Sequence, residues 1–127
     1  VEEFMKAWDV LPARDAHEDK ARSIERAAQV LDASNADHCD WLATLAFYAA
    51  LHWLDAVLAD RGLHPSNHRE RNRAAQGLPI WDQYYELYAL SRIARYEAGR
   101  LPQTVAVSMR DQNLPTVRNW AQQAKRS

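Results

Sequence analysis

The sequence contains little cysteine, glycine or proline, and this scarcity already narrows the classes of fold. Among its 127 residues there are one cysteine, three glycines and five prolines. So few chain-breaking residues favour long helices over many short strands joined by turns. The single Cys39 cannot form an intramolecular disulfide, and no CxxC pair offers sulfur ligands to zinc. This cysteine usage fits a reducing compartment, and we expect a cytoplasmic protein.

The sequence also lacks an excess of either charge. Its formal net charge is -1, so no overall cationic field draws it to nucleic acid, and any phosphate binding has to use a local patch. Thirteen of the sixteen basic residues are arginine, the side chain best suited to bidentate contact with phosphate. The alternative is a compositional bias that leaves these arginines solvated on the surface.

Apolar residues make up 47% of the chain, enough for the core of one domain over residues 1–127. The longest apolar run, WLATLAFYAALHWLDAVLA over 41–59, raises the question of a membrane span. His52 and Asp55 lie inside this run, and a charge in mid-bilayer is costly. We therefore interpret it as the central helix of a soluble domain that does not contact a membrane. The opening stretch VEEFMKAWDV lacks the long apolar segment of a secretory signal.

Apolar spacing predicts an all-α fold, because three- and four-residue periods recur and no convincing pair of strands is present. We expect long helices over about 15–33, 37–61 and 80–98. Gly62 is placed to end the second of them. Four large side chains of that second helix are expected to be among its less exposed residues: Trp41, Leu45, Leu51 and Trp53.

The remaining segments are shorter. The first ten residues are expected to form a short helix, and three side chains at this end are expected to face the core: Phe4, Trp8 and Leu11. Asn67, with Glu70 three residues later, has the pattern of a capping box that starts a short helix, HRERNRAAQ. The segment RLPQTVAV at 100–107 is expected to be extended or irregular. A last helix includes TVRNWAQQA, with Pro115 tolerated near its first turn.

Three segments carry a family resemblance. The first is an alanine-rich run with tyrosine that ends in a glycine turn, FYAALHWLDAVLADRGLHP. A histidine then opens a short helix in SNHRER at 66–71, and SRIARYEAG supplies Arg92, Ala94 and Tyr96 near the end of the next long helix. In this order the segments resemble the HEPN superfamily, the higher-eukaryote and prokaryote nucleotide-binding domains, over roughly residues 20–125.

The resemblance implies an up-down bundle of four to five helices with a HEPN-like core over about 15–126, commonly as a dimer. Family members include metal-independent ribonucleases, toxins of toxin-antitoxin pairs and inactive partners of nucleotidyltransferases. The ribonucleases carry an arginine, a polar residue and, after a gap of four to six residues, a histidine. Arg61 and His68 have six residues between them, but Gly62 follows the arginine where the family has a polar residue. Arg71 and Asn72 match the opening and have no histidine at the required distance.

Residues 61–73 concentrate the chemistry that a ribonuclease needs. Histidine suits proton transfer because its pKa lies near neutrality, and arginine suits the charge on a phosphate. His68 with Arg61 or Arg71 is therefore the candidate catalytic set. The structural alternative is that His68 only begins the third helix.

The same segment is also the candidate ligand-binding surface. The residues expected to contact a phosphate or nucleotide are His64, His68, Arg69 and Arg73. Arg69 and Arg73 are four apart and share one helical face, whereas Arg71 points elsewhere. Pro65 argues against a metal pair formed by the two histidines, and no cysteine or carboxylate nearby completes such a site. We expect neither a metal nor a cofactor.

The leading hypothesis is a non-catalytic HEPN-like domain that binds a protein partner, such as a nucleotidyltransferase, or a nucleotide. The alternative is a metal-independent ribonuclease of a toxin-antitoxin or defence system. Five tryptophans and five tyrosines are hard to bury in one small domain, so the cluster at 81–88 predicts a homodimer through helical faces. Any binding of RNA or a nucleotide is expected to be weak and sensitive to salt.

Overall fold

The computed structural model describes residues 11–127, and over this range the chain is all helix with no strand. This confirms the predicted fold class. The helix expected over 1–10, with Phe4 and Trp8, lies outside the described residues. Leu11 is described and is 64% exposed, so the prediction that it faces the core is wrong. The elements in chain order are α2 (Arg14–Ala28), α3 (Ala36–Asp60), α4 (His68–Ala75), α5 (Trp81–Tyr96), α6 (Gln103–Ser108), η1 (Met109–Asn113) and α7 (Leu114–Gln123).

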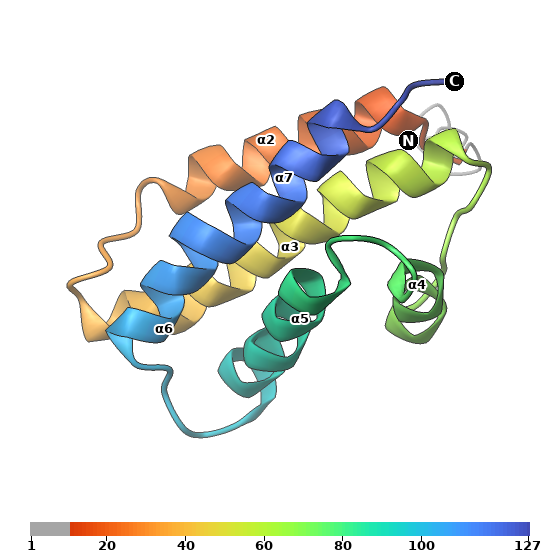
Figure 1. The fold of residues 1–127 in the computed structure, drawn as a ribbon. Coiled ribbons are helices and arrows are strands. Elements are labelled where there is room, and N and C mark those ends of the chain that lie inside the picture. The colour runs from red at the N-terminus through yellow and green to blue at the C-terminus, as the bar shows by residue number, and fades with distance from the viewer. Residues whose placement is uncertain (1–10) are drawn as a thin grey trace, which may run out of the picture.

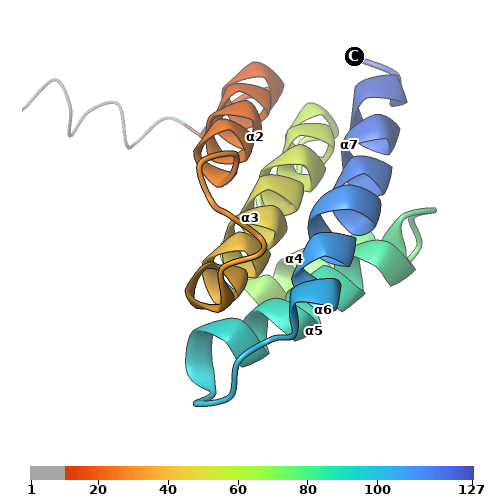
Figure 2. The same ribbon diagram turned by 90° about the vertical axis from the view of Figure 1, so that its left-hand side faces the viewer.

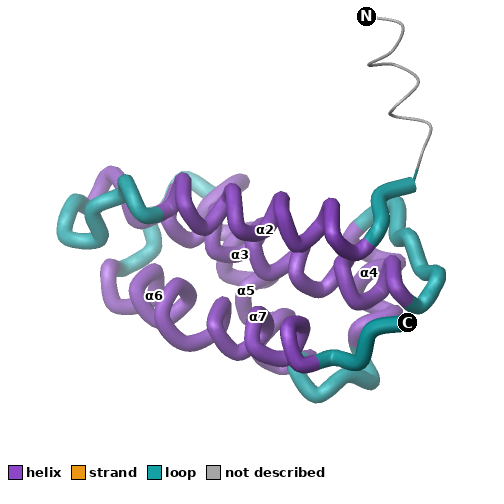
Figure 3. Tube along the Cα trace, turned by 90° about the horizontal axis from the view of Figure 1, so that it is seen from above, coloured by secondary structure: helices purple, strands orange, loops and turns teal. Residues whose placement is uncertain are grey.

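Helix α3 lies at the centre of the described fold (Figures 1 and 2). Helix α2 runs antiparallel along one side of α3, and α6 and α7 run along the other side in the same direction as α3 (Figures 1 and 2). Helix α5 crosses beneath these helices, and the short α4 lies at the end where α3 finishes (Figures 1 and 3). This arrangement places α4 and α5 on the same side of α3, where the candidate site is built.

The composition of α3 explains its central position. Alanines and large apolar residues alternate around the whole helix, so neighbouring helices can approach it from several sides. By length and composition alone α3 could cross a membrane, but 72% of its most apolar window is buried inside the protein. It begins after Asn35, whose side chain accepts a hydrogen bond from the Asp37 amide, and it ends at Asp60, two residues before Gly62, where φ is +77°. Both ends agree with the predicted helix over 37–61.

Side-chain exposure along α3 agrees with the prediction only in part. Trp53 is fully buried and Leu51 is nearly so, whereas Leu45 is half-buried. Trp41 is 65% exposed, so the prediction that it belongs to the less exposed residues is wrong. It lies in the second turn of α3, where it lines a pocket beside the last turn of α5. The apolar spacing that predicts a helix over 80–98 forms one buried stripe of Ile80, Tyr84, Leu87 and Ser91, and Ala94 further along it is half-buried.

The prediction that residues 100–107 are extended or irregular is wrong from Gln103 onward, because α6, η1 and α7 form one continuous helix there. The helix contains a wider π turn, in which the Leu114 amide donates to the Met109 carbonyl. Pro115 supplies the physical reason. A proline inside an α-helix has no N–H and its ring clashes with the carbonyl four residues earlier, and a π turn relieves that clash.

Two histidines meet where α2 packs against α3. The Nδ1 atoms of His17 and His52 lie 3.1 Å apart, whereas their ring centroids lie 5.4 Å apart. The two nitrogens therefore face each other, and one must carry the proton that the other accepts. Burial lowers the pKa of His52 to about 4, and the charge of His17 acts in the same direction. Burial also lowers the pKa of His17.

We predict that acid weakens the junction between α2 and α3. The pKa of His52 is lower in the folded chain than the unfolded value of about 6.5, so its contribution to stability is present above that value. The contribution is lost as the pH falls from 6.5 toward 4. Urea unfolding at several pH values should show this loss, and the loss should be smaller in His52→Gln. His64→Gln, which changes an exposed histidine, should behave like the parent. Equal pH dependence in the parent and in His52→Gln would contradict the role of the pair.

Candidate functional site

The site is built on a buried ion pair between α3 and α4. Asp55 and Arg71 are 6% and 8% exposed. Arg71 donates from Nε to Asp55 Oδ1 at 2.8 Å and from Nη2 to Oδ2 at 3.1 Å. Such a bidentate pair fixes the guanidinium plane as well as its position. Arg71 is a candidate catalytic residue, and in the structure its pairing with Asp55 attaches α4 to α3.

The hydrogen bonds at the start of α4 determine where His68 stands. The Asn67 side chain accepts from the Glu70 amide at 2.9 Å, as the capping pattern predicts. The Glu70 carboxylate accepts in return from the Ser66 amide and hydroxyl, at 2.9 and 3.0 Å. In a standard capping box the Glu70 carboxylate would accept from the amide of the N-cap residue, Asn67. Here it accepts from the amide of the preceding residue, Ser66. His68 is the first residue of α4, directly after this cap.

The remaining terminal nitrogen of Arg71 controls the protonation of His68. Arg71 Nη1 lies 3.4 Å from His68 Nδ1. Arginine can only donate, so Nδ1 is the acceptor and the neutral imidazole carries its proton on Nε2. Burial lowers the pKa of His68, and the positive charges of Arg71, Arg95 and Arg92 lower it further. The neutral form with an Nε2–H donor is thus the form that this surrounding favours.

Aromatic rings from α3 and α5 enclose the imidazole. The His68 ring centroid is 5.4 Å from that of Tyr88 and 5.8 Å from that of Phe47. The fully buried Tyr84 packs against the same Phe47 ring. The Tyr84 hydroxyl has no hydrogen-bond partner within the described protein, and burial raises its pKa. These rings hold His68 in place and keep the wall of the site apolar.

Two arginines of α5 complete the site. Arg92 is exposed and donates to the Tyr88 hydroxyl at 3.1 Å. Arg95 donates to the Tyr48 hydroxyl at 3.0 Å, and its guanidinium carbon lies 5.2 Å from the Phe47 ring centroid. Among residues 11–127, neither arginine forms an ion pair with a carboxylate. Uncompensated positive charge therefore gathers around His68.

The other predicted site residues lie apart from this cluster. Arg61 and His64 are exposed in the turn after α3, and the contacts of His68 are with Phe47, Tyr88 and Arg71 instead. His64 lines a shallow hollow of about 260 Å³ that His68 does not reach. Two further candidates, Arg69 and Arg73, are exposed and share a face of α4, as their spacing predicts, and line another hollow of about 290 Å³. Of the predicted residues, His68 is in contact only with Arg71, and Arg69 and Arg73 lie together on the exposed face of the same helix.

Tyr88, Arg92 and Arg95 form much of the site, and the sequence reasoning did not assign them to it. A signal for them existed. Residues 85, 88, 92 and 95 are three or four apart, so they lie on one face of α5. Their approach to His68 depends on the crossing of α5 with α3, which periodicity cannot give.

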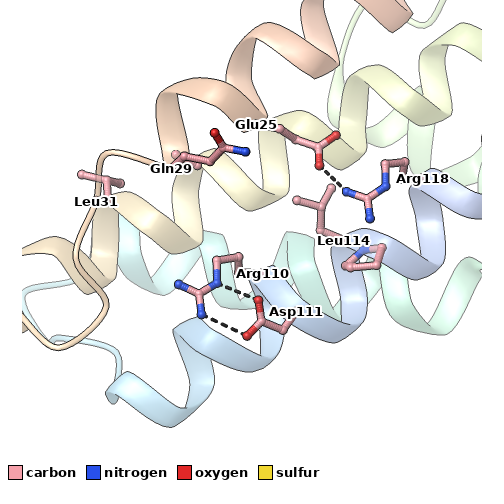
Figure 4. Close-up of a pocket in the computed structure, with 9 residues that line it drawn as sticks. Glu25, Gln29, Leu31, Arg110, Asp111, Leu114 and Arg118 are labelled. Atoms are coloured by element: carbon pink, nitrogen blue, oxygen red, sulfur yellow. Dashed lines mark hydrogen bonds and ion pairs between the residues drawn. The ribbon is translucent and has the colours of Figure 1, made fainter.

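A third hollow, of about 440 Å³, lies between α2 and the η1–α7 segment (Figure 4). Both arginines that line this hollow already pair with carboxylates. Arg110 binds both carboxylate oxygens of Asp111, at 2.7 and 2.9 Å, and Arg118 pairs with Glu25. Because these charges balance one another, this hollow attracts a charged ligand less than the His68 cluster does.

Comparison with protein-family models, with curated proteins and with solved structures gave no match. Over residues 11–127, moreover, no group of three or more histidine, cysteine, aspartate or glutamate side chains is arranged to hold a metal ion.

We predict that Arg71→Met is strongly destabilising, because it leaves the buried Asp55 without a partner. Breaking a buried pair in this way typically costs about 3–5 kcal/mol. The double variant Asp55→Leu with Arg71→Met should recover part of this loss, since no charge remains buried. Arg69→Met, on the exposed face of the same helix, serves as the control. Chemical unfolding of the four proteins measures the effect, and a small loss in Arg71→Met would show that the pair does not hold α4.

Proposed function

We propose that this chain is a non-catalytic helical domain of the HEPN type that binds the phosphate groups of a nucleotide at the cluster of His68, Arg92 and Arg95. The observation that carries the proposal is that neither Arg92 nor Arg95 has a carboxylate partner among residues 11–127. The positive charges of both arginines also lower the pKa of the half-buried His68. An anion would relieve this concentration of positive charge. The HEPN resemblance supports a nucleotide as the source of the anion.

The donors of the cluster suit a phosphate. The guanidiniums of Arg92 and Arg95 are anchored by hydrogen bonds to tyrosine hydroxyls, which reduces the side-chain freedom lost when a ligand binds. Neutral His68 adds an Nε2–H donor. Planar guanidinium groups can donate two hydrogen bonds to one phosphate.

The protonation of His68 supports binding over catalysis. A general base must have a free lone pair on the nitrogen that meets the substrate. Here Arg71 occupies Nδ1, so Nε2 holds the proton and cannot accept one. The low pKa of His68 also disfavours the imidazolium form that a general acid needs. The ribonuclease hypothesis retains one favourable observation, the proximity of His68 to Arg71.

Titration with pyrophosphate in a calorimeter tests the proposal. We expect weak binding that falls steeply with salt. Arg92→Ala and His68→Ala should each weaken it by about tenfold, as expected for the loss of a hydrogen bond to a charged ligand. Arg69→Ala removes an exposed arginine outside the cluster and should leave the affinity unchanged. Equal affinities of the parent and the three variants for pyrophosphate would contradict the proposal.

An RNA-cleavage assay on the same proteins distinguishes the alternative. The binding proposal expects no cleavage by the parent protein or by His68→Ala. A ribonuclease would instead lose about 10²–10⁴-fold in turnover in that variant, because proton transfer contributes on this scale.

We also propose that a second copy of the chain docks on the aromatic face of α5. Successive rings touch along this face. Trp81 and Tyr85 have centroids 5.1 Å apart, and Tyr85 and Tyr88 have centroids 5.9 Å apart. Tyr85 and Tyr96 are 48% and 73% exposed. Contact between two such faces would remove these rings from water, and a protein partner such as a nucleotidyltransferase would compete for the same surface.

Sedimentation velocity measures this assembly directly. The parent should sediment as a dimer in the micromolar range, and Tyr85→Ser should shift it toward monomer. Val30→Ser alters an apolar side chain that is 82% exposed in the turn after α2 and should leave the dimer intact. Only monomer at high micromolar concentration would count against the proposal.

A further inference from the structure

We propose that the pocket around Trp41 and Asp40 is a base subsite that selects guanine, so that the nucleotide of the proposed function is a guanine nucleotide. This inference rests on that proposed function for the phosphate end of the ligand. The pocket has a volume of about 560 Å³. Its lining comes from the first turns of α3, the end of α5 and Arg100: Ala36, Asp37, Asp40, Trp41, Thr44, Ala94, Arg95 and Arg100.

Arg95 joins this pocket to the His68 cluster. It lines the pocket, and its guanidinium lies over the Phe47 ring on which His68 also packs. Trp41 and Tyr48 are seven residues apart on α3 and so lie on one face of it, about 10 Å apart along the helix axis, and the Tyr48 hydroxyl accepts from Arg95. A ligand with an aromatic group at Trp41 and a phosphate at His68 would thus lie along α3, with Arg95 between its ends. A mononucleotide has this arrangement of parts.

The exposed indole supplies a stacking surface. Trp41 is 65% exposed at the pocket although the fold buries Trp53 completely. Every nucleobase can stack on an aromatic ring, and such stacking contributes strongly to affinity. Stacking alone does not choose between bases, so selection has to come from the polar atoms of the pocket.

Asp40 is the group that can distinguish guanine from adenine. Its Oδ1 accepts from the Leu101 amide at 2.9 Å, which fixes the carboxylate. Its Oδ2 has no hydrogen-bond partner within residues 11–127, whereas the neighbouring Asp37 is paired with Arg100. A carboxylate only accepts hydrogen bonds. Guanine presents two adjacent donors, N1–H and the N2 amino group. Adenine presents its N1 lone pair beside its amino group, and a carboxylate repels that lone pair.

Calorimetry with GDP, ADP, guanosine and pyrophosphate tests the inference on the full chain. We expect GDP to bind at least about tenfold more tightly than ADP, since a site built for specific donors rejects a base that lacks them. Asp40→Asn should remove this preference, while the new amide oxygen can still accept from Leu101. Asp19→Asn, which changes an exposed carboxylate on α2, should preserve the preference. Trp41→Ala should weaken GDP and ADP by about tenfold each and leave pyrophosphate unchanged.

The four ligands separate the two proposals. If pyrophosphate binds and GDP binds no better than ADP, the phosphate site stands and the guanine subsite is overturned. If guanosine binds through Asp40 and pyrophosphate does not bind, the subsite stands and the phosphate site is overturned. If none of the ligands binds, both the phosphate site and the guanine subsite are overturned. Circular dichroism of each variant confirms that a lost affinity does not come from a lost fold.

Discussion

The bidentate ion pair between Asp55 and Arg71 joins α4 to α3 in a place that little water reaches. Helix α4 has only eight residues, of which Arg71 and Ala75 are buried. A helix this short is not stable alone in water, so its structure depends on this attachment. The position of His68 depends on it in turn, because the same guanidinium contacts the imidazole. The candidate site is thus a consequence of one buried charge and its partner.

The contacts that run from Asp55 through Arg71 to His68 differ from those around a catalytic histidine. In many hydrolases a carboxylate accepts from Nδ1–H and leaves the second nitrogen free to act as a base. Here an arginine stands between the carboxylate and the imidazole, so the proton moves to the outer nitrogen. The histidine becomes a fixed donor. The two guanidiniums of α5 add charge of the same sign, and together these groups form a surface suited to an anion.

The sequence predicted the features that depend on local pattern. The bounds of α3, the Asn67 cap, the Gly62 stop and the buried stripe of α5 all follow from periodicity and end residues, and all are confirmed. It failed for Trp41, because periodicity does not tell how far the neighbouring helices extend along α3. It also failed for 103–107, where short-range composition gave no sign that the helix from Leu114 continues backward.

The candidate site could be predicted only in outline. Residues 61–73 drew attention to His68 and Arg71, but the partner of Arg71 lies sixteen residues earlier, on another helix. Arg92 and Arg95 reach the site through the crossing of α5 over α3. Such meetings depend on tertiary geometry. A short motif read along the chain therefore could not reveal that Asp55 is the partner of Arg71.

The π turn at Met109–Asn113 lies in the middle of a helix whose buried side is continuous. Ala106 before the turn and Val117 after it are both buried and are eleven residues apart, which is close to three turns of an α-helix. Ala121 follows four residues later and is buried as well. The wider turn thus accommodates Pro115 without interrupting the buried stripe, and the helix packs along α3 as one element from Gln103 to Gln123.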